Sequence, residues 1–246
     1  MVSLDDLNKK IYELLKLVDS EKYNEAQDLI KFILNNNDYF ALINSNHWQY
    51  IGDVYLACGE FQLAKNAYIK ANNALSEAFV SILTGDIESA KKLLMNAKPS
   101  PASNWCRFLI SVFSGTNRFV SPPSFLTIRH FLEMTVYYLL LACNHKYLEL
   151  LLKSLNKLMD VNLDSEKLVG YAYFHFGDLV KSSDFLYSAL KKNDMDGEIY
   201  YMLGRLYVFK EEYGRALNML EKARLLLDDH APTKELIEIV KTKIKD

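Results

Sequence analysis

Apolar residues recur along the chain at spacings of three and four, which is the period of an amphipathic α-helix. The first segment, residues 4–35, predicts a helix pair whose first helix carries the stripe Leu4, Leu7, Ile11, Leu14, Leu15 and Val18. Further helices follow at about 45–57 and 61–71, as a shortened pair over 76–96 with its turn at Gly85, at 102–114, 124–143 and 146–160, and then from 163 to 245. The pattern therefore predicts an all-α fold of about fourteen helices and no strands.

The hydrophobic pattern also repeats with a period of 34 residues, seen when the chain is aligned with itself. Segment 163–196 then falls on segment 197–230, pairing Gly170 with Gly204, Tyr173 with Tyr207, Leu186 with Leu220 and Ala189 with Ala223. Segment 45–78 fits the same frame through Trp48, Ile51, Gly52, Tyr55, Ala64, Tyr68 and Ala71. The first four of these residues share one helix face and the last three share another, with a turn at Gly59 between them. Small residues at 52, 64 and 71 predict a close approach of the two helices.

This pattern resembles the tetratricopeptide repeat, a helix-turn-helix of 34 residues. Segment 45–78 is the best match, 197–230 is nearly as good, and 163–196 departs at Glu166 and Ser182. The resemblance implies a right-handed superhelix, or α-solenoid, whose concave groove binds peptides. We expect a single domain over residues 1–246, with an irregular break near 115–124 and a C-terminal capping helix at 232–245.

Charge and composition exclude some classes of protein. Lys and Arg number 29 against 31 Asp and Glu, so the net charge of −2 excludes a polybasic arm. The most apolar stretch, residues 136–143, is far shorter than the roughly 20 residues of a membrane span. The first residues carry acid where a signal peptide carries base, so we expect a soluble, cytoplasmic protein.

The sequence contains no recognisable catalytic, metal-binding or phosphate-binding motif. The three cysteines lie far apart, the five histidines form no metal-binding spacing, and no glycine-rich phosphate loop occurs. We therefore expect a non-enzymatic scaffold or adaptor, with no catalytic residues, no cofactor and no metal. The expected partner is a protein or peptide, and homo-oligomerisation is left open.

The repeat frame selects a candidate binding face. On the first helix of each repeat, five positions lie opposite the packing face: the second, fifth, ninth, twelfth and thirteenth residues. In the last two repeats these positions supply the predicted peptide-binding groove, which consists of Lys167, Tyr171, His175, Tyr201 and Arg205. In the alternative interpretation, Phe174, Val208 and Phe209 on this face pack against the next repeat.

Two rival functions stay open. The first is a chaperone-like holder of one dedicated partner. The second is an RNA- or polyanion-binding repeat that uses residues 89–130, which contain no acidic residue; its basic residues are Lys91, Lys92, Lys98, Arg107, Arg118 and Arg129. Because the overall charge is slightly acidic, nucleic acid is not expected as the main partner. Gln49 and Asp53 stand where some repeats of this kind use Lys and Asn to hold chaperone tails, which disfavours that role.

Overall fold

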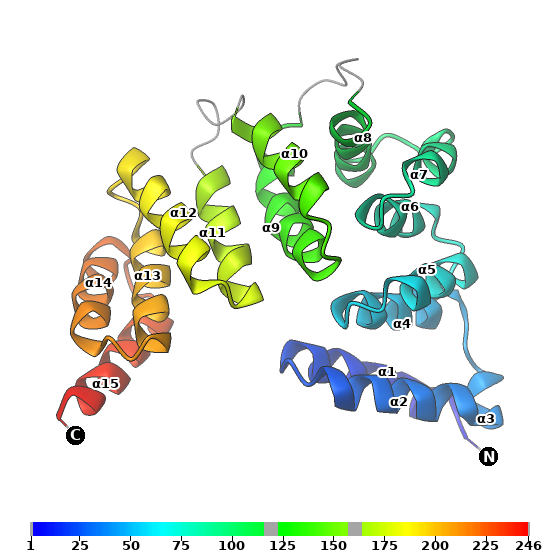
Figure 1. Cartoon of the computed structure of the whole chain (residues 1–246). Helices are drawn as coiled ribbons and strands as arrows, with labels where there is room; N and C mark the ends of the chain where they lie inside the picture. The colour runs from blue at the N-terminus through cyan, green and yellow to red at the C-terminus, as the bar shows by residue number, and fades with distance from the viewer. Residues whose placement is uncertain (1, 116–122, 157–163, 246) are drawn as a thin grey trace. The chain divides into compact units, whose positions relative to one another are not determined.

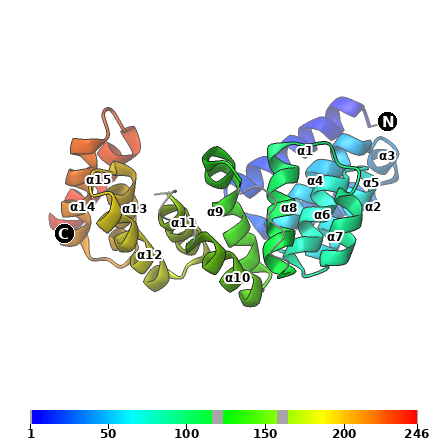
Figure 2. The ribbon, with the colours of Figure 1, turned by 90° about the horizontal axis from the view of Figure 1, so that it is seen from above.

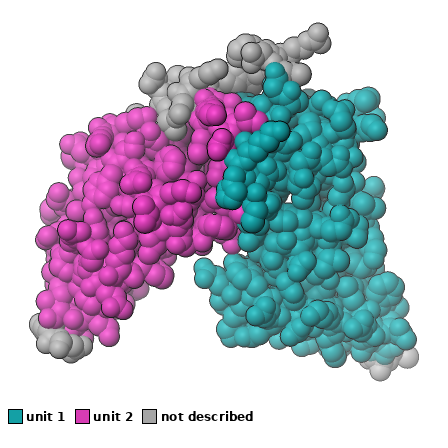
Figure 3. Space-filling view, in the orientation of Figure 1, with its two compact units in different colours: residues 1–123, 141–147 teal, residues 124–140, 148–246 magenta. Residues whose placement is uncertain are grey.

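The computed structural model describes residues 2–115, 123–156 and 164–245, and these residues form fifteen helices and no strands (Figure 1). They group into two compact units, residues 1–123 with 141–147 and residues 124–140 with 148–246 (Figure 3). The all-α class is therefore confirmed, and the single domain stays a prediction.

Unit 1 is built of paired helices. They are α1 (Leu4–Asp19), α2 (Tyr23–Asn35), α3 (Asn37–Phe40), α4 (Ser45–Ala57), α5 (Phe61–Lys70), α6 (Ala74–Leu83), α7 (Ile87–Leu94) and α8 (Pro101–Phe113). The pairs α4 with α5 and α6 with α7 lie side by side (Figure 2). Ser3 begins α1 with a capping box, in which its hydroxyl accepts from the backbone of Asp6 and the Asp6 carboxylate accepts in return. The buried stripe of α1 packs with Ile30 of α2 and Ile51 of α4.

The boundary between unit 1 and unit 2 falls within two helices. They are α9 (Phe125–Leu141) and α10 (His145–Asn156). The predicted helix at 146–160 is present up to Asn156, and its last residues lie outside the described residues. Most of the predicted break near 115–124 also lies outside them.

The rest of unit 2 repeats the same pairing. Its helices are α11 (Ser165–Phe176), α12 (Leu179–Lys192), α13 (Gly197–Phe209), α14 (Tyr213–Leu226) and α15 (Ala231–Lys245). The core contains Leu186, Leu203, Leu206 and Leu220, and Ile237 and Val240 of α15 join it. Gly170 and Gly204 occupy equivalent places, since a Cβ on either would lie within 3 Å of Leu186 or Leu220 of the paired helix. The 34-residue frame read from the sequence thus matches the packing.

One helix was not expected from the sequence. The four-residue helix α3 begins where the Asn36 side chain accepts hydrogen bonds from the backbone of Asp38 and Tyr39. A single turn is too short to show a hydrophobic period, so only its cap residue signals it.

Candidate binding face on helices α11 and α13

Helices α11 and α13 are the first helices of two consecutive repeats, and they contact each other within unit 2. An aspartate stands immediately before the first residue of each helix. Asp164 precedes α11, and Asp196 caps α13 by accepting from the backbone of Glu198 at 3.0 Å and of Ile199 at 3.4 Å. Helix α11 is buried over most of its length, so His175 is the one exposed residue among the predicted positions on it. On α13 the predicted residues Tyr201 and Arg205 are half-buried, and Phe209 at the end of the helix is exposed.

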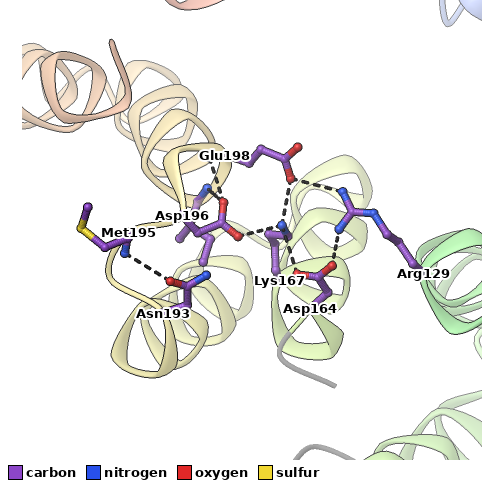
Figure 4. Close-up of polar contacts among 8 residues, drawn as sticks. Arg129, Asp164, Lys167, Asn193, Met195, Asp196 and Glu198 are labelled. Carbon is purple, nitrogen blue, oxygen red and sulfur yellow. Dashed lines mark hydrogen bonds and ion pairs between the residues drawn. The ribbon is translucent and has the colours of Figure 1, made fainter. Parts of the chain in front are cut away.

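Lys167 lies at the centre of an ion-pair network at one end of this face (Figure 4). Its Nζ lies 2.8 Å from Asp196 Oδ2, 2.8 Å from Glu198 Oε2 and 3.3 Å from Asp164 Oδ1. Arg129 of α9 pairs with Asp164 and lies 3.5 Å from Glu198 Oε2. The network therefore links α9, α11 and α13.

Lys167 is one of the predicted groove residues, but the structure places its side chain inside the ion-pair network and not on the surface. Its side chain is only 4% exposed, because it is enclosed by Asp164 one turn before it, by Asp196 at the end of its own repeat and by Glu198 of the next repeat. Burial works to lower the pKa of Lys167, but hydrogen bonds and charge from Asp196 and Glu198 raise it above its ordinary value. Lys167 is thus a charged structural residue of the face.

Arg205 has different surroundings. Its guanidinium carbon lies 4.8 Å from the ring centre of Phe174 and 5.9 Å from that of Tyr201. A guanidinium nitrogen also lies 3.7 Å from the Met202 sulfur. Among the described residues Arg205 forms no ion pair with a carboxylate. The rings therefore hold a half-buried cation without neutralising it.

Phe209 completes an aromatic group around Arg205. Its ring meets that of Phe174 edge-on at 5.3 Å, and 67% of Phe209 is exposed. The alternative packing interpretation thus holds for Phe174, which is buried, and for Val208, which is half-buried against the same core, whereas Phe209 is exposed. We call Phe174, Tyr201, Arg205 and Phe209 the aromatic–arginine patch.

The other predicted residues flank this patch. Tyr171 is half-buried, and burial followed by the charges of Glu198, Asp196 and Glu133 raises the pKa of its hydroxyl. His175 is exposed, with Nε2 3.8 Å from Glu133 Oε1 on α9. The structure therefore brings Tyr201 and Arg205 together, and places Tyr171 and His175 on the side that meets α9.

Three further residues of this face were not predicted from the repeat pattern. Arg129 and Glu133 come from α9, whose segment shows no 34-residue match. His230 lies just before α15 and meets the ring of Tyr201 edge-on at 4.9 Å. The sequence shows Arg129 only as a basic residue of the acid-free stretch, and nothing in it assigns Arg129 or Glu133 to this face. His230 lies just before the predicted C-terminal helix, so its position next to the last repeat could have been anticipated.

Several basic residues of the acid-free stretch, residues 89–130, form hydrogen bonds or ion pairs within the fold. Arg107 donates to the carbonyl oxygens of Ala97 at 2.7 Å and Leu94 at 3.3 Å, and Lys91 pairs with Glu88 at 2.7 Å. Arg129 belongs to the network above, and Arg118 lies outside the described residues. Only Lys92 and Lys98 are exposed and form no ion pair within the described residues.

Comparison with known proteins decides the repeat type. The family model of the tetratricopeptide repeat matches residues 197–223, which span α13 and most of α14. The chain contains a tetratricopeptide repeat. The resemblance read from the sequence is confirmed, and tetratricopeptide repeats generally mediate protein–protein interaction, typically in non-enzymatic scaffolds.

Two solved structures are similar to the chain. A tetratricopeptide repeat protein from Parabacteroides merdae ATCC 43184 is 16% identical, with 96% of this chain and 98% of that chain covered and a TM-score of 0.38. The APC/C hetero-tetramer Cut9–Hcn1 is also 16% identical, with 96% of this chain and 46% of that chain covered and a TM-score of 0.35. A search of curated proteins found no match.

Two further findings concern chemistry and membranes. Across residues 2–115, 123–156 and 164–245, no group of three or more His, Cys, Asp or Glu side chains is placed to hold a metal ion. Within the same ranges, no helix has both the length and the apolar character needed to cross a membrane.

Proposed function

We propose that the chain is a non-enzymatic interaction module that binds a peptide or a segment of a partner protein on the α11–α13 face. Contacts come from Tyr171, His175, Tyr201, Arg205 and Phe209, while Lys167 holds the two helices in register. The observation that carries this proposal is the aromatic–arginine patch, in which an exposed Phe209 adjoins an arginine without a carboxylate partner among the described residues.

The composition of the patch suits binding. Tyr and Arg are enriched among the residues that dominate binding energies, and large aromatic side chains bury much surface at low entropic cost. Arg205 already rests on two rings, so it loses less rotamer freedom on binding than a fully solvated arginine. An exposed Phe209 gains by leaving water.

Affinity purification with the full chain tests the proposal. Proteins captured by the wild type are identified by mass spectrometry, purified and titrated against the chain by calorimetry. Phe209→Ala is expected to weaken binding by about 1–3 kcal/mol, as truncation of an interface anchor does. Leu225→Ala on α14 is the matched control, because Leu225 is 75% exposed but lies outside the face.

The outcomes separate the alternatives. Equal binding by wild type and Phe209→Ala would place the site elsewhere. Recovery of one partner in a fixed ratio would favour the chaperone-like holder, and recovery of several partners sharing a short segment would favour an adaptor.

A further inference from the structure

The charges of the α11–α13 face are unevenly distributed. Three cations lie on it: Arg129, Lys167 and Arg205. Arg129, which reaches the face from α9, and Lys167 are neutralised by Asp164, Asp196 and Glu198, three carboxylates for two cations. A fourth carboxylate, Glu133 of α9, lies 3.8 Å from His175 Nε2. Arg205 forms no ion pair with a carboxylate of the described residues. The face is therefore acidic at the first turns of α11 and α13, and it has one uncompensated positive charge further along α13.

Arg205 is well prepared to receive a carboxylate. Its guanidinium is half-buried and lies against Phe174 and Tyr201, where the local dielectric is lower than in water. A planar guanidinium binds a carboxylate with two parallel hydrogen bonds, and such charge-assisted bonds are about twice as strong as neutral ones. Phe209, one turn further along α13, offers an apolar surface beside that position.

The aromatic residues on either side of Arg205 indicate that a bound peptide extends beyond Arg205 in both directions. Tyr201 and Phe209 lie one turn before and one turn after Arg205 on the same helix face, a span of about 12 Å. About four extended residues cover that distance. A segment that touches both aromatic residues therefore passes over Arg205 and presents a side-chain carboxylate there, because a terminal carboxylate would leave one of the rings uncovered.

We infer that the partner segment carries an internal Asp or Glu that pairs with Arg205 and an apolar side chain, within two residues of it, that packs on Phe209. This inference rests on the proposed function and names the chemistry of its partner. The ion-pair network has one more carboxylate than cations, and the Glu198 side chain in it is 47% exposed. A second acidic residue of the peptide on the Glu198 side of Arg205 is therefore expected to weaken binding by like-charge repulsion.

A peptide array tests the inference. The full chain is bound to decapeptides of varied sequence that are acetylated and amidated at their ends, so that only side chains carry charge. A parallel set has free C-termini. The strongest blocked binder is synthesised and titrated, together with a version in which its acidic residue is replaced by the amide. We expect that replacement to weaken binding about tenfold or more, as loss of one member of a close charge pair does.

Variants of the chain complete the test. Arg205→Gln is expected to weaken the acidic peptide to the same extent and to leave the amide peptide unchanged. Arg215→Gln is the matched control. Arg215 also lies over a ring, 5.8 Å from the centre of Tyr207, but it already has a carboxylate, Glu212, at 2.8 Å.

Each outcome has a distinct meaning. Binders that lose affinity in Phe209→Ala but not on exchange of acid for amide would overturn the inference and leave the proposed function standing. Binding only by peptides with free C-termini would also overturn it. If no peptide responds to Phe209→Ala or Arg205→Gln, both the inference and the proposed function fail.

Discussion

Gly52 of α4 lies directly against the ring of Tyr68 of α5. A methyl group on Gly52 would lie 2.5 Å from Cε1 of Tyr68 and 2.7 Å from its Cδ1. The ring cannot retreat easily, because Tyr68 is 1% exposed and its hydroxyl donates to Asp53 Oδ1 at 2.8 Å. The small residue at this place therefore sets how closely the two helices of the pair approach.

Enlarging Gly52 is expected to destabilise unit 1. Gly52→Val should lower the free energy of unfolding by about 2 kcal/mol or more, because overpacking a fixed ring forces the helices apart. Urea denaturation followed by circular dichroism measures the effect. Gly214→Ala on α14 is the control: a Cβ there meets nothing within 4 Å, so the change is expected to be neutral or slightly stabilising. Unchanged stability of Gly52→Val would show that the α4–α5 contact is wrong.

Removal of the Lys167 charge is expected to destabilise unit 2. Lys167→Met leaves Asp164, Asp196 and Glu198 facing one cation, Arg129, and breaking a buried ion pair on one side costs about 3–5 kcal/mol. The exposed Lys181, which pairs with Asp178 at 3.5 Å, supplies the control Lys181→Met, expected to stay within about 1 kcal/mol. Equal unfolding midpoints for the two variants would contradict the buried network.

The same network predicts a pH dependence. The hydrogen bond from Lys167 lowers the pKa of Glu198 below 4.5, so the unfolded chain binds that proton more readily than the folded chain. The contribution of Glu198 is therefore present above pH 4.5 and is lost as the pH falls through the folded pKa. Lys167 has a raised pKa, so its contribution is lost only as the pH rises beyond 10.5.

Urea unfolding between pH 6 and pH 3 checks this sign. We expect the wild type to lose more stability on acidification than Lys167→Met does, since the carboxylates of the variant are relieved by protonation. A steeper acid loss in the variant would contradict the assignment.

Nucleic acid is not expected to bind the acid-free stretch. Arg107, Lys91 and Arg129 are engaged within the fold, which leaves too few exposed cations for a phosphate track. Fluorescence anisotropy with labelled RNA at low and high salt measures this. A complex whose affinity falls with a log–log salt slope of several units, and which is lost in the double variant Lys91→Glu, Lys92→Glu, would overturn the expectation.

The sequence predicted those features that depend on one repeat alone. Helix pairs, the close glycines Gly52 and Gly204, and the face that contains Tyr201 and Arg205 follow from periodicity within 34 residues. The burial of Lys167 did not follow, because it depends on Asp196 at the junction of the two repeats and on Glu198 of the next repeat. Residues that meet only when repeats stack, such as Arg129 with Asp164, need the angle between repeats, which the pattern of one repeat does not contain.

Hydrogen exchange of the full chain, with and without the strongest blocked acidic peptide, tests the central claim most directly. The account predicts that added protection is concentrated in residues 165–176 and 197–209, the helices α11 and α13, with no comparable change in α1 to α8. Protection centred instead on α8, residues 101–113, with α13 unchanged, would contradict the assignment of the binding face.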